Sequence, residues 1–226
     1  MFELSKRLLS CASLVSSKNI VDVGTDHAKL PIWLLKNNII NDSIACDITD
    51  FSINRSINNV KKYKLQDKIK VVFSDGLSNI DQNYSDTIVI AGLGGTTISE
   101  ILRKCPWTNK KNKNFILQPT KSDSDLRIFL ANSGFSIDSE LVVNDSKFSY
   151  STILSKFTGS TYKFDDLYPF VGKIHPCKES CNYIKKHIRY IEKILKGAII
   201  NDNIELINKT EKVYTGLCNF LSDCRK

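Results

Sequence analysis

The stretch "NIVDVGTDHAKLPIWLL", residues 19 to 35, decides the fold of this chain. A short apolar run leads to a single glycine, Gly24, and an apolar helical pattern follows. A strand, a tight turn and a helix in this order are typical of the first unit of an open parallel sheet. Thr25, Asp26 and His27 stand where a dinucleotide-binding loop has further glycines. The loop therefore disfavours a pyrophosphate, which Asp26 would repel, and suits a ligand that carries positive charge.

The rest of the chain up to residue 158 alternates short β-branched runs with segments long enough for a helix, as in a parallel sheet covered on both faces. Strands are predicted over Ile20–Val23, Ser43–Asp47, Ile69–Phe73, Thr87–Ala91 and Asn114–Gln118, and helices over 2–15, Lys29–Lys36, Ile53–Tyr63, Thr96–Lys104 and Ser122–Ser133. Two further runs, "FSIDSELVV" and "YSTILSKF", have no helical pattern between them and are expected to close the sheet as an antiparallel pair. We therefore predict an α/β fold with a Rossmann-like sheet over residues 1–158.

The last part of the chain, residues 159–226, has a different pattern. In "CNYIKKHIRYIEKILKGA" the apolar residues recur at steps of three and four, which places them on one helical face. After a break at "NDN" (201–203), a second amphipathic pattern runs from Ile204 to Leu221. Two such patterns predict a helical hairpin that buries its seam and forms a second domain.

Composition limits the cellular setting and the partners. The net charge of +8 favours a polyanionic partner, although a surface that only needs solubility is the alternative. Seven scattered cysteines without a CxxC pair suit reduced thiols, and His175, Cys177 and Cys181 lack a fourth ligand, so no metal is expected. No apolar run is long enough to cross a bilayer. We expect a cytoplasmic protein with no membrane partner, in the form of a monomer.

Four successive strand ends favour a nucleoside ligand. Asp47 lies about 20 residues beyond Gly24, where a carboxylate can accept hydrogen bonds from both ribose hydroxyls. Asp75 can accept from an exocyclic adenine amine, and Gly76 gives the base room. The fourth strand ends in "IAGLGG" (90–95), whose glycines keep the backbone close to the ligand. Acids and glycines end strands in many α/β proteins, so the coincidence of the four is what carries the inference.

The motifs together identify a family. "RLLSCASLV", "VDVGTDHAKLPIWLL", "ACDI", "SDGL", "DTIVIAGLGGTTISEIL" and "ILQPTKSDSDLRIFLANSGFSIDSELV", followed by the helical hairpin, closely resemble the bacterial tRNA adenine-22 N1-methyltransferases. The resemblance runs in order over essentially the whole chain. It departs from the family at Leu93, where methionine is usual, at Thr25, where serine is common, and over residues 144–152. These enzymes use S-adenosylmethionine and have a C-terminal coiled-coil-like domain.

The resemblance implies the cofactor and the site. S-Adenosylmethionine has a sulfonium cation and an amino-acid head in place of phosphates, which suits the loop at Gly24. The expected cofactor contacts are Gly24, Thr25, Asp26, His27, Leu30, Asp47, Ile48, Asp75, Gly76, Ala91, Gly92 and Leu93. Asp26 is the candidate for a catalytic carboxylate facing the target adenine. Arg7, the second catalytic candidate, is expected to contact a substrate phosphate or to hold Asp26, with a packed surface arginine as the alternative.

The expected partner is tRNA, recognised through its shape and phosphates. The RNA-binding candidates are Lys110, Lys111, Lys113, Lys185, Lys186, Arg189 and Lys193, and the hairpin over 159–226 is the expected tRNA-binding domain. Two other functions stay open from the residues alone. One is a class I methyltransferase that acts on a small molecule, and the other is a non-catalytic RNA-binding module. The absence of a [DN]PP[YF] motif after the fourth strand disfavours methylation of an exocyclic amine.

Overall fold

The core of the protein is a seven-stranded sheet with the strand order β3-β2-β1-β4-β5-β7-β6. The structure, a computed structural model, describes residues 2–225. Met1 and Lys226, the first and last residues of the two predicted domains, lie outside the described residues. The strands are β1 (Asn19–Val23), β2 (Asp42–Asp47), β3 (Ile69–Phe73), β4 (Thr87–Leu93), β5 (Asn114–Pro119), β6 (Phe135–Asp145) and β7 (Phe148–Phe157). The first five pair in parallel, and β7 pairs antiparallel with both β5 and β6. The strand order reverses between β1 and β4, which is where ligands bind in open sheets.

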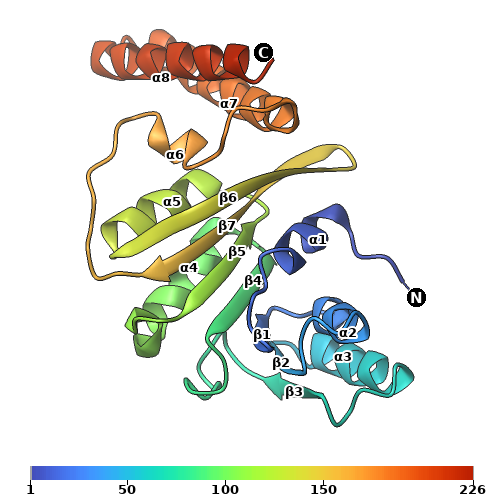
Figure 1. Ribbon diagram of the computed structural model, residues 1–226. Coiled ribbons are helices and arrows are strands. Elements are labelled where there is room, and N and C mark those ends of the chain that lie inside the picture. Colours follow the sequence, from blue (N-terminus) through green and yellow to red (C-terminus); the bar gives the residue numbers. More distant parts are fainter. Residues whose placement is uncertain (1, 226) are drawn as a thin grey trace.

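Helices cover both faces of this sheet (Figure 1). One face packs on α1 (Lys6–Ala12), α2 (Lys29–Lys36) and α3 (Asp50–Lys62), and the other on α4 (Gly95–Lys104) and α5 (Asp123–Asn132). Successive residues of the central strand show the alternation, because Ile88 and Ile90 join the α4–α5 core while Val89 joins the α1–α3 core. The predicted α/β fold with a Rossmann-like sheet is confirmed.

The C-terminal hairpin consists of α7 (Cys181–Ile200) and α8 (Ile204–Asp223), with the break at the predicted place. It lies beyond the β6 and β7 side of the sheet, and the short helix α6 (Tyr168–Val171) lies between the two (Figure 1). The seam buries Ile184, Ile191 and Leu217. Ile204, which the sequence pattern places on the seam, is 71% exposed because it begins α8 at the tip of the hairpin.

The remaining differences from the sequence prediction lie at element ends and in three short additional elements. The first helix begins only at Lys6, because Ser5 caps it by accepting from the backbone N–H of Leu8. The third helix begins at Asp50 rather than Ile53, because Thr49 caps Ser52. The 3-10 turns η1 (Pro106–Asn109) and η2 (Lys178–Ser180), like α6, have no periodic signal in the sequence.

Candidate active site

Two adjoining cavities lie at the carboxyl ends of the parallel strands. The first, of about 380 Å³, is walled mainly by Ile48, Leu77 and Ile101 and has Asp75 at its rim. The second, of about 320 Å³, is lined by charged and polar side chains, and we refer to it as the polar cavity: Arg7, Asp22, Thr25, Asp26, His27 and Lys29 line it with Leu8, Leu30 and residues 91–93. Gly24, Asp47 and Leu93 line both cavities. The twelve residues predicted from the sequence as cofactor contacts all line one cavity or the other.

Gly24 forms the narrow junction between the cavities. Its φ of +73° is in the left-handed region that favours glycine. A Cβ atom on Gly24 would lie 3.4 Å from Leu93 Cδ1, so the backbone and this side chain approach each other closely. Thus a ligand that spans both cavities has to pass directly over the bare backbone at Gly24.

Asp47 is oriented at the same junction. Its Oδ1 accepts hydrogen bonds from the backbone N–H and the hydroxyl of Thr49, both at 3.0 Å. This turn fixes the carboxylate at the end of β2, where it can accept hydrogen bonds from a diol. Asp75, at the far side of the first cavity, has a long and exposed ion pair with Lys104 at 3.6 Å, which leaves its carboxylate free to accept from a ligand amine.

Asp26 is at the exposed rim of the polar cavity, in a left-handed conformation with a φ of +49°. The nearest cation is Arg55, whose Nη1 lies 3.4 Å from Oδ1, and His27 Nε2 lies 3.3 Å from Oδ2. Arg55 also contacts His27 and lies over the ring of Phe51. Burial lowers the pKa of His27, and the charges of Arg55 and Lys29 act in the same direction, against the opposing effect of Asp26. The imidazole is therefore neutral at pH 7, and the positive partner of Asp26 is Arg55.

Arg7 does not pair with Asp26, which was one of the two partners expected for it. Its Nη1 donates to Gln118 Oε1 at 2.6 Å, and its guanidinium lies over Gly92 on the floor of the polar cavity. The ion pair with Asp26 that the sequence suggested is formed by Arg55 instead.

The sequence pattern did not single out three residues of this site. Asp22 is buried in the wall of the polar cavity and accepts from Thr25 Oγ1 at 2.6 Å. Arg55 comes from the middle of α3, and Gln118 is fully buried at the end of β5. A polar residue inside an apolar strand was the available signal for Asp22 and Gln118, because buried polar groups need partners.

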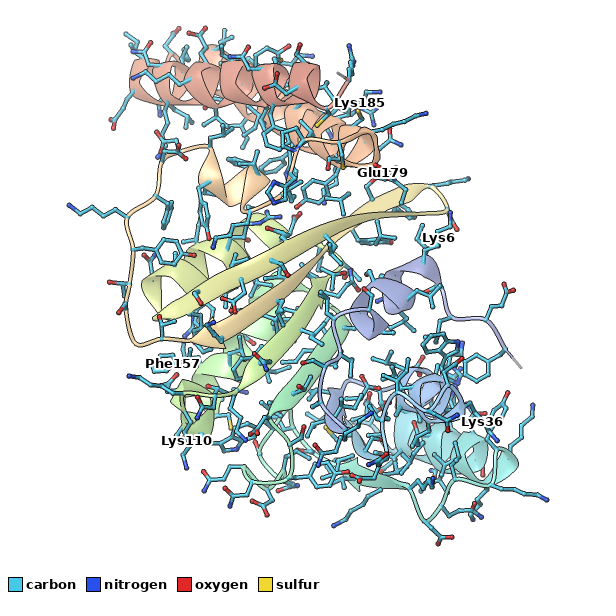
Figure 2. The ribbon with its side chains drawn as sticks, in the orientation of Figure 1. Lys6, Lys36, Lys110, Phe157, Glu179 and Lys185 are labelled. Carbon is cyan, nitrogen blue, oxygen red and sulfur yellow. The ribbon has the colours of Figure 1, made fainter. Side chains whose placement is uncertain are left out.

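The RNA-binding candidates divide into two groups in space. Lys110, Lys111 and Lys113 precede β5, so they lie at the amino edge of the sheet, opposite the cavities. Figure 2 shows Lys110 near Phe157 at the lower left of the view, and Lys6 and Lys185 toward its right side. The prediction that Lys113 binds RNA is wrong, because Lys113 is buried and its Nζ donates to two backbone carbonyls and to Asp86. It is a structural lysine and cannot reach a phosphate.

The cations of α7 form the second group. Lys185, Lys186, Arg189, Lys193 and Lys196 follow at helical spacing and share the face opposite the buried one. In Figure 2, Lys185 lies in the hairpin, toward the same side of the view as Lys6 on α1. Lys186 forms an ion pair with Asp123, with 3.3 Å between Nζ and Oδ2. In the part of the chain that the structure describes, no cluster of His, Cys, Asp and Glu is placed to hold a metal ion, and no helix is long and apolar enough to span a membrane.

Comparison with known proteins agrees with this geometry. A family model described as "Methyltransferase domain" matches residues 4–153. The tRNA (adenine(22)-N(1))-methyltransferase of Bacillus subtilis is 30% identical over 155 residues, which cover 68% of this chain and 65% of that protein. A protein of Mycoplasma genitalium provisionally named tRNA methyltransferase MG248 is 33% identical over 158 residues, which cover 67% of this chain and 69% of that protein.

A solved structure matches almost the whole chain. TrmK from M. capricolum, in complex with the natural cofactor product S-adenosyl-homocysteine, has a TM-score of 0.79 and 28% sequence identity. The match covers 98% of this chain and 99% of that one. The likeness therefore includes the helical hairpin as well as the sheet.

Proposed function

This chain belongs to the methyltransferase domain family, and from this premise we propose that it transfers the methyl group of S-adenosylmethionine to N1 of adenine 22 in tRNA. The observation that carries the proposal is the pair of cavities joined over Gly24. One is mainly apolar with acids at its ends, and the other is polar and charged. S-Adenosylmethionine is divided in the same way, with an adenosine group at one end and a charged amino-acid group at the other.

The residues present fit this cofactor. Ile48 and Ile101 can enclose the adenine, with Asp75 placed to accept from its amine. Asp47 suits the ribose hydroxyls at the junction. Asp22, buried in the wall of the polar cavity, provides negative charge for a cationic group. When bound, S-adenosylmethionine supplies a methyl group activated by its sulfonium.

The chain's own contribution to the reaction is positioning and electrostatics. Adenine N1 attacks with an in-plane lone pair, so no proton has to be removed first. The purine becomes positively charged as the bond forms, and the exposed carboxylate of Asp26 at the rim of the polar cavity would stabilise that charge. Arg7, on the other side of the same cavity, is placed to hold the nucleotide by its phosphate or base. Both roles are part of the proposal.

We also propose that the hairpin over 159–226 supplies the tRNA-binding surface. The cations on the exposed face of α7 can neutralise phosphates, while the folded RNA presents its target base at the carboxyl edge of the sheet. The lysines at the amino edge have no part in this arrangement.

Nucleoside analysis tests the proposed reaction. Unmodified tRNA incubated with the protein and labelled S-adenosylmethionine should yield 1-methyladenosine after digestion. Mass spectrometry and chromatography separate this nucleoside from N6-methyladenosine and 5-methylcytidine. Label found only in one of those two products would rule out the proposed reaction.

Protonation of Asp22 should weaken cofactor binding at acid pH. Burial raises the pKa of Asp22 to about 6, with Asp47 acting in the same direction and the hydrogen bond from Thr25 against it. The carboxylate that attracts the cationic cofactor is therefore present above about pH 6 and lost as the pH falls through that value. Titration calorimetry should show affinity about tenfold weaker near pH 5 than near pH 7. Asp22→Asn should flatten this dependence, and an equally steep profile in that variant would assign it to another group.

A further inference from the structure

Gln118 connects three parts of the candidate site through one buried side chain. It is fully buried at the carboxyl end of β5. Its Oε1 accepts from Arg7 Nη1 at 2.6 Å and from the backbone N–H of Gly92 at 3.2 Å, and its Nε2 donates to Pro119 O at 2.8 Å. Both ends of the amide are thus used, so its orientation is fixed by hydrogen bonds.

The contact with Gly92 supports an irregularity of β4. Ala91 pairs with Gln118 and Leu93 pairs with Pro119, so Gly92 is an extra residue in the ladder. Its N–H has no regular strand partner and is satisfied by the side chain of Gln118. Gly92 has a φ of +85°, and a Cβ atom there would lie 3.0 Å from Arg7 Nη1. The guanidinium of Arg7 therefore packs closely against the backbone at Gly92, where a side chain would crowd it.

The backbone of α1 is held independently of this contact. Ser10 Oγ hydrogen-bonds to Thr152 Oγ1 on β7 at 2.6 Å, and the backbone N–H of Arg7 donates to Asp145 at 3.3 Å. Cys11 and Ala12 are buried in the core. Loss of Gln118 should therefore leave the helix in place and release only the side chain of Arg7 and the peptide of Gly92.

We propose that Gln118 is a positioning residue for the methyl-transfer reaction, holding the guanidinium of Arg7 over the Gly92 bulge in the polar cavity. The inference rests on the proposed function, because it assigns Gln118 a part in that reaction. It acts through Arg7 and Gly92 and does not line either cavity. Misplacement of a substrate-orienting group by about 1 Å can cost about 10²-fold in rate, so the effect on turnover should be large.

A double-mutant cycle tests the coupling. Gln118→Met keeps the length of the side chain but removes the acceptor, and should lower kcat by about 10²-fold, a larger change than in the affinity for S-adenosylmethionine, whose cavity Gly92 lines. Arg7→Met should lower kcat by a similar or larger factor. Because Gln118 acts through Arg7, the double variant should be no worse than Arg7→Met within about threefold. Losses that multiply in the double variant, or an unchanged kcat in Gln118→Met, overturn the proposal.

A control variant and a spectroscopic measurement separate this role from a structural one. Thr108→Val removes a fully buried hydroxyl that donates to two backbone carbonyls at the amino edge of the sheet, and should destabilise the fold without changing kcat. The guanidinium NMR signal of Arg7 gives a readout without turnover, since it should broaden or shift in Gln118→Met and not in Thr108→Val. An unchanged signal in Gln118→Met contradicts the proposal even if wild type proves inactive on tRNA. Inactive wild type would instead count against the proposed function.

Discussion

Replacing Arg127 by methionine should lower the free energy of unfolding by about 3–5 kcal/mol, because it leaves the carboxylate of Glu140 buried without its cation. Both side chains are fully buried. Arg127 Nη2 lies 2.5 Å from Glu140 Oε1, and Nε donates to the same carboxylate. Urea unfolding followed by circular dichroism measures the loss.

The effect is large because Arg127 joins the sheet domain to the hairpin. It extends from α5, donates to Pro169 O in α6 at 2.7 Å, and donates to the hydroxyl of Tyr183 on α7 at 2.6 Å. Tyr183 in turn donates to Asp123 at the start of α5. Cutting the chain near residue 158 would remove Pro169 and Tyr183, two hydrogen-bond partners of this buried arginine, so removal of the hairpin is a poor test of its role in RNA binding.

Two further variants test whether the loss of stability comes from the unpaired buried charge. Arg127→Met combined with Glu140→Met removes both charges and should recover part of the lost stability, because no unpaired charge stays buried. Lys209→Met breaks a surface ion pair with Asp166 and should change stability by less than about 1 kcal/mol. If Arg127→Met costs no more than Lys209→Met, the pair does not stabilise the join between sheet and hairpin.

Reversing the charge of Lys185, Arg189 and Lys193 together should weaken tRNA binding by about 10²-fold or more at moderate salt. The three follow at steps of four residues along the exposed face of α7, so they can contact phosphates along one groove. The slope of log affinity against log salt should also become shallower, by about 0.7–0.9 for each phosphate that the protein no longer neutralises. Fluorescence anisotropy with labelled tRNA at several salt concentrations measures both quantities.

The control is reversal of Lys110 and Lys111, two lysines that are exposed at the amino edge of the sheet. It changes the net charge in the same direction at a surface that faces away from the cavities, and should leave the salt slope unchanged. Cofactor affinity should be unchanged in both variants. Equal weakening by both reversals would mean that overall charge, and not the α7 surface, governs binding.

The sequence predicted the sheet well because its signal is local. β-branched runs ended by Gly24, Asp47 and Asp75 set both the strands and the ligand edge, and the helical hairpin followed from the spacing of apolar residues such as Ile184, Ile188 and Ile191. Where a cap decides the end of a helix, as at Ser5 and Thr49, the apolar pattern alone misplaced it by a few residues.

Pairings between distant residues could not be predicted in the same way. Nothing local shows that Arg55 rather than Arg7 holds Asp26, since the two arginines come from different helices. Nor does the pattern distinguish the exposed Lys110 from the buried Lys113, whose acceptors lie about 30 residues earlier in the chain. Tertiary contacts decide both cases.

The central claim is that this chain methylates one ring nitrogen at one position of tRNA, and primer extension on treated tRNA tests it most directly. Methylation at N1 blocks the Watson–Crick edge, so reverse transcription should stop or misread at nucleotide 22 only after incubation with both the protein and S-adenosylmethionine. A tRNA with guanine at that position should show no stop and take up no methyl group. A stop at a different nucleotide, or equal methylation of the guanine-22 tRNA, would contradict the account.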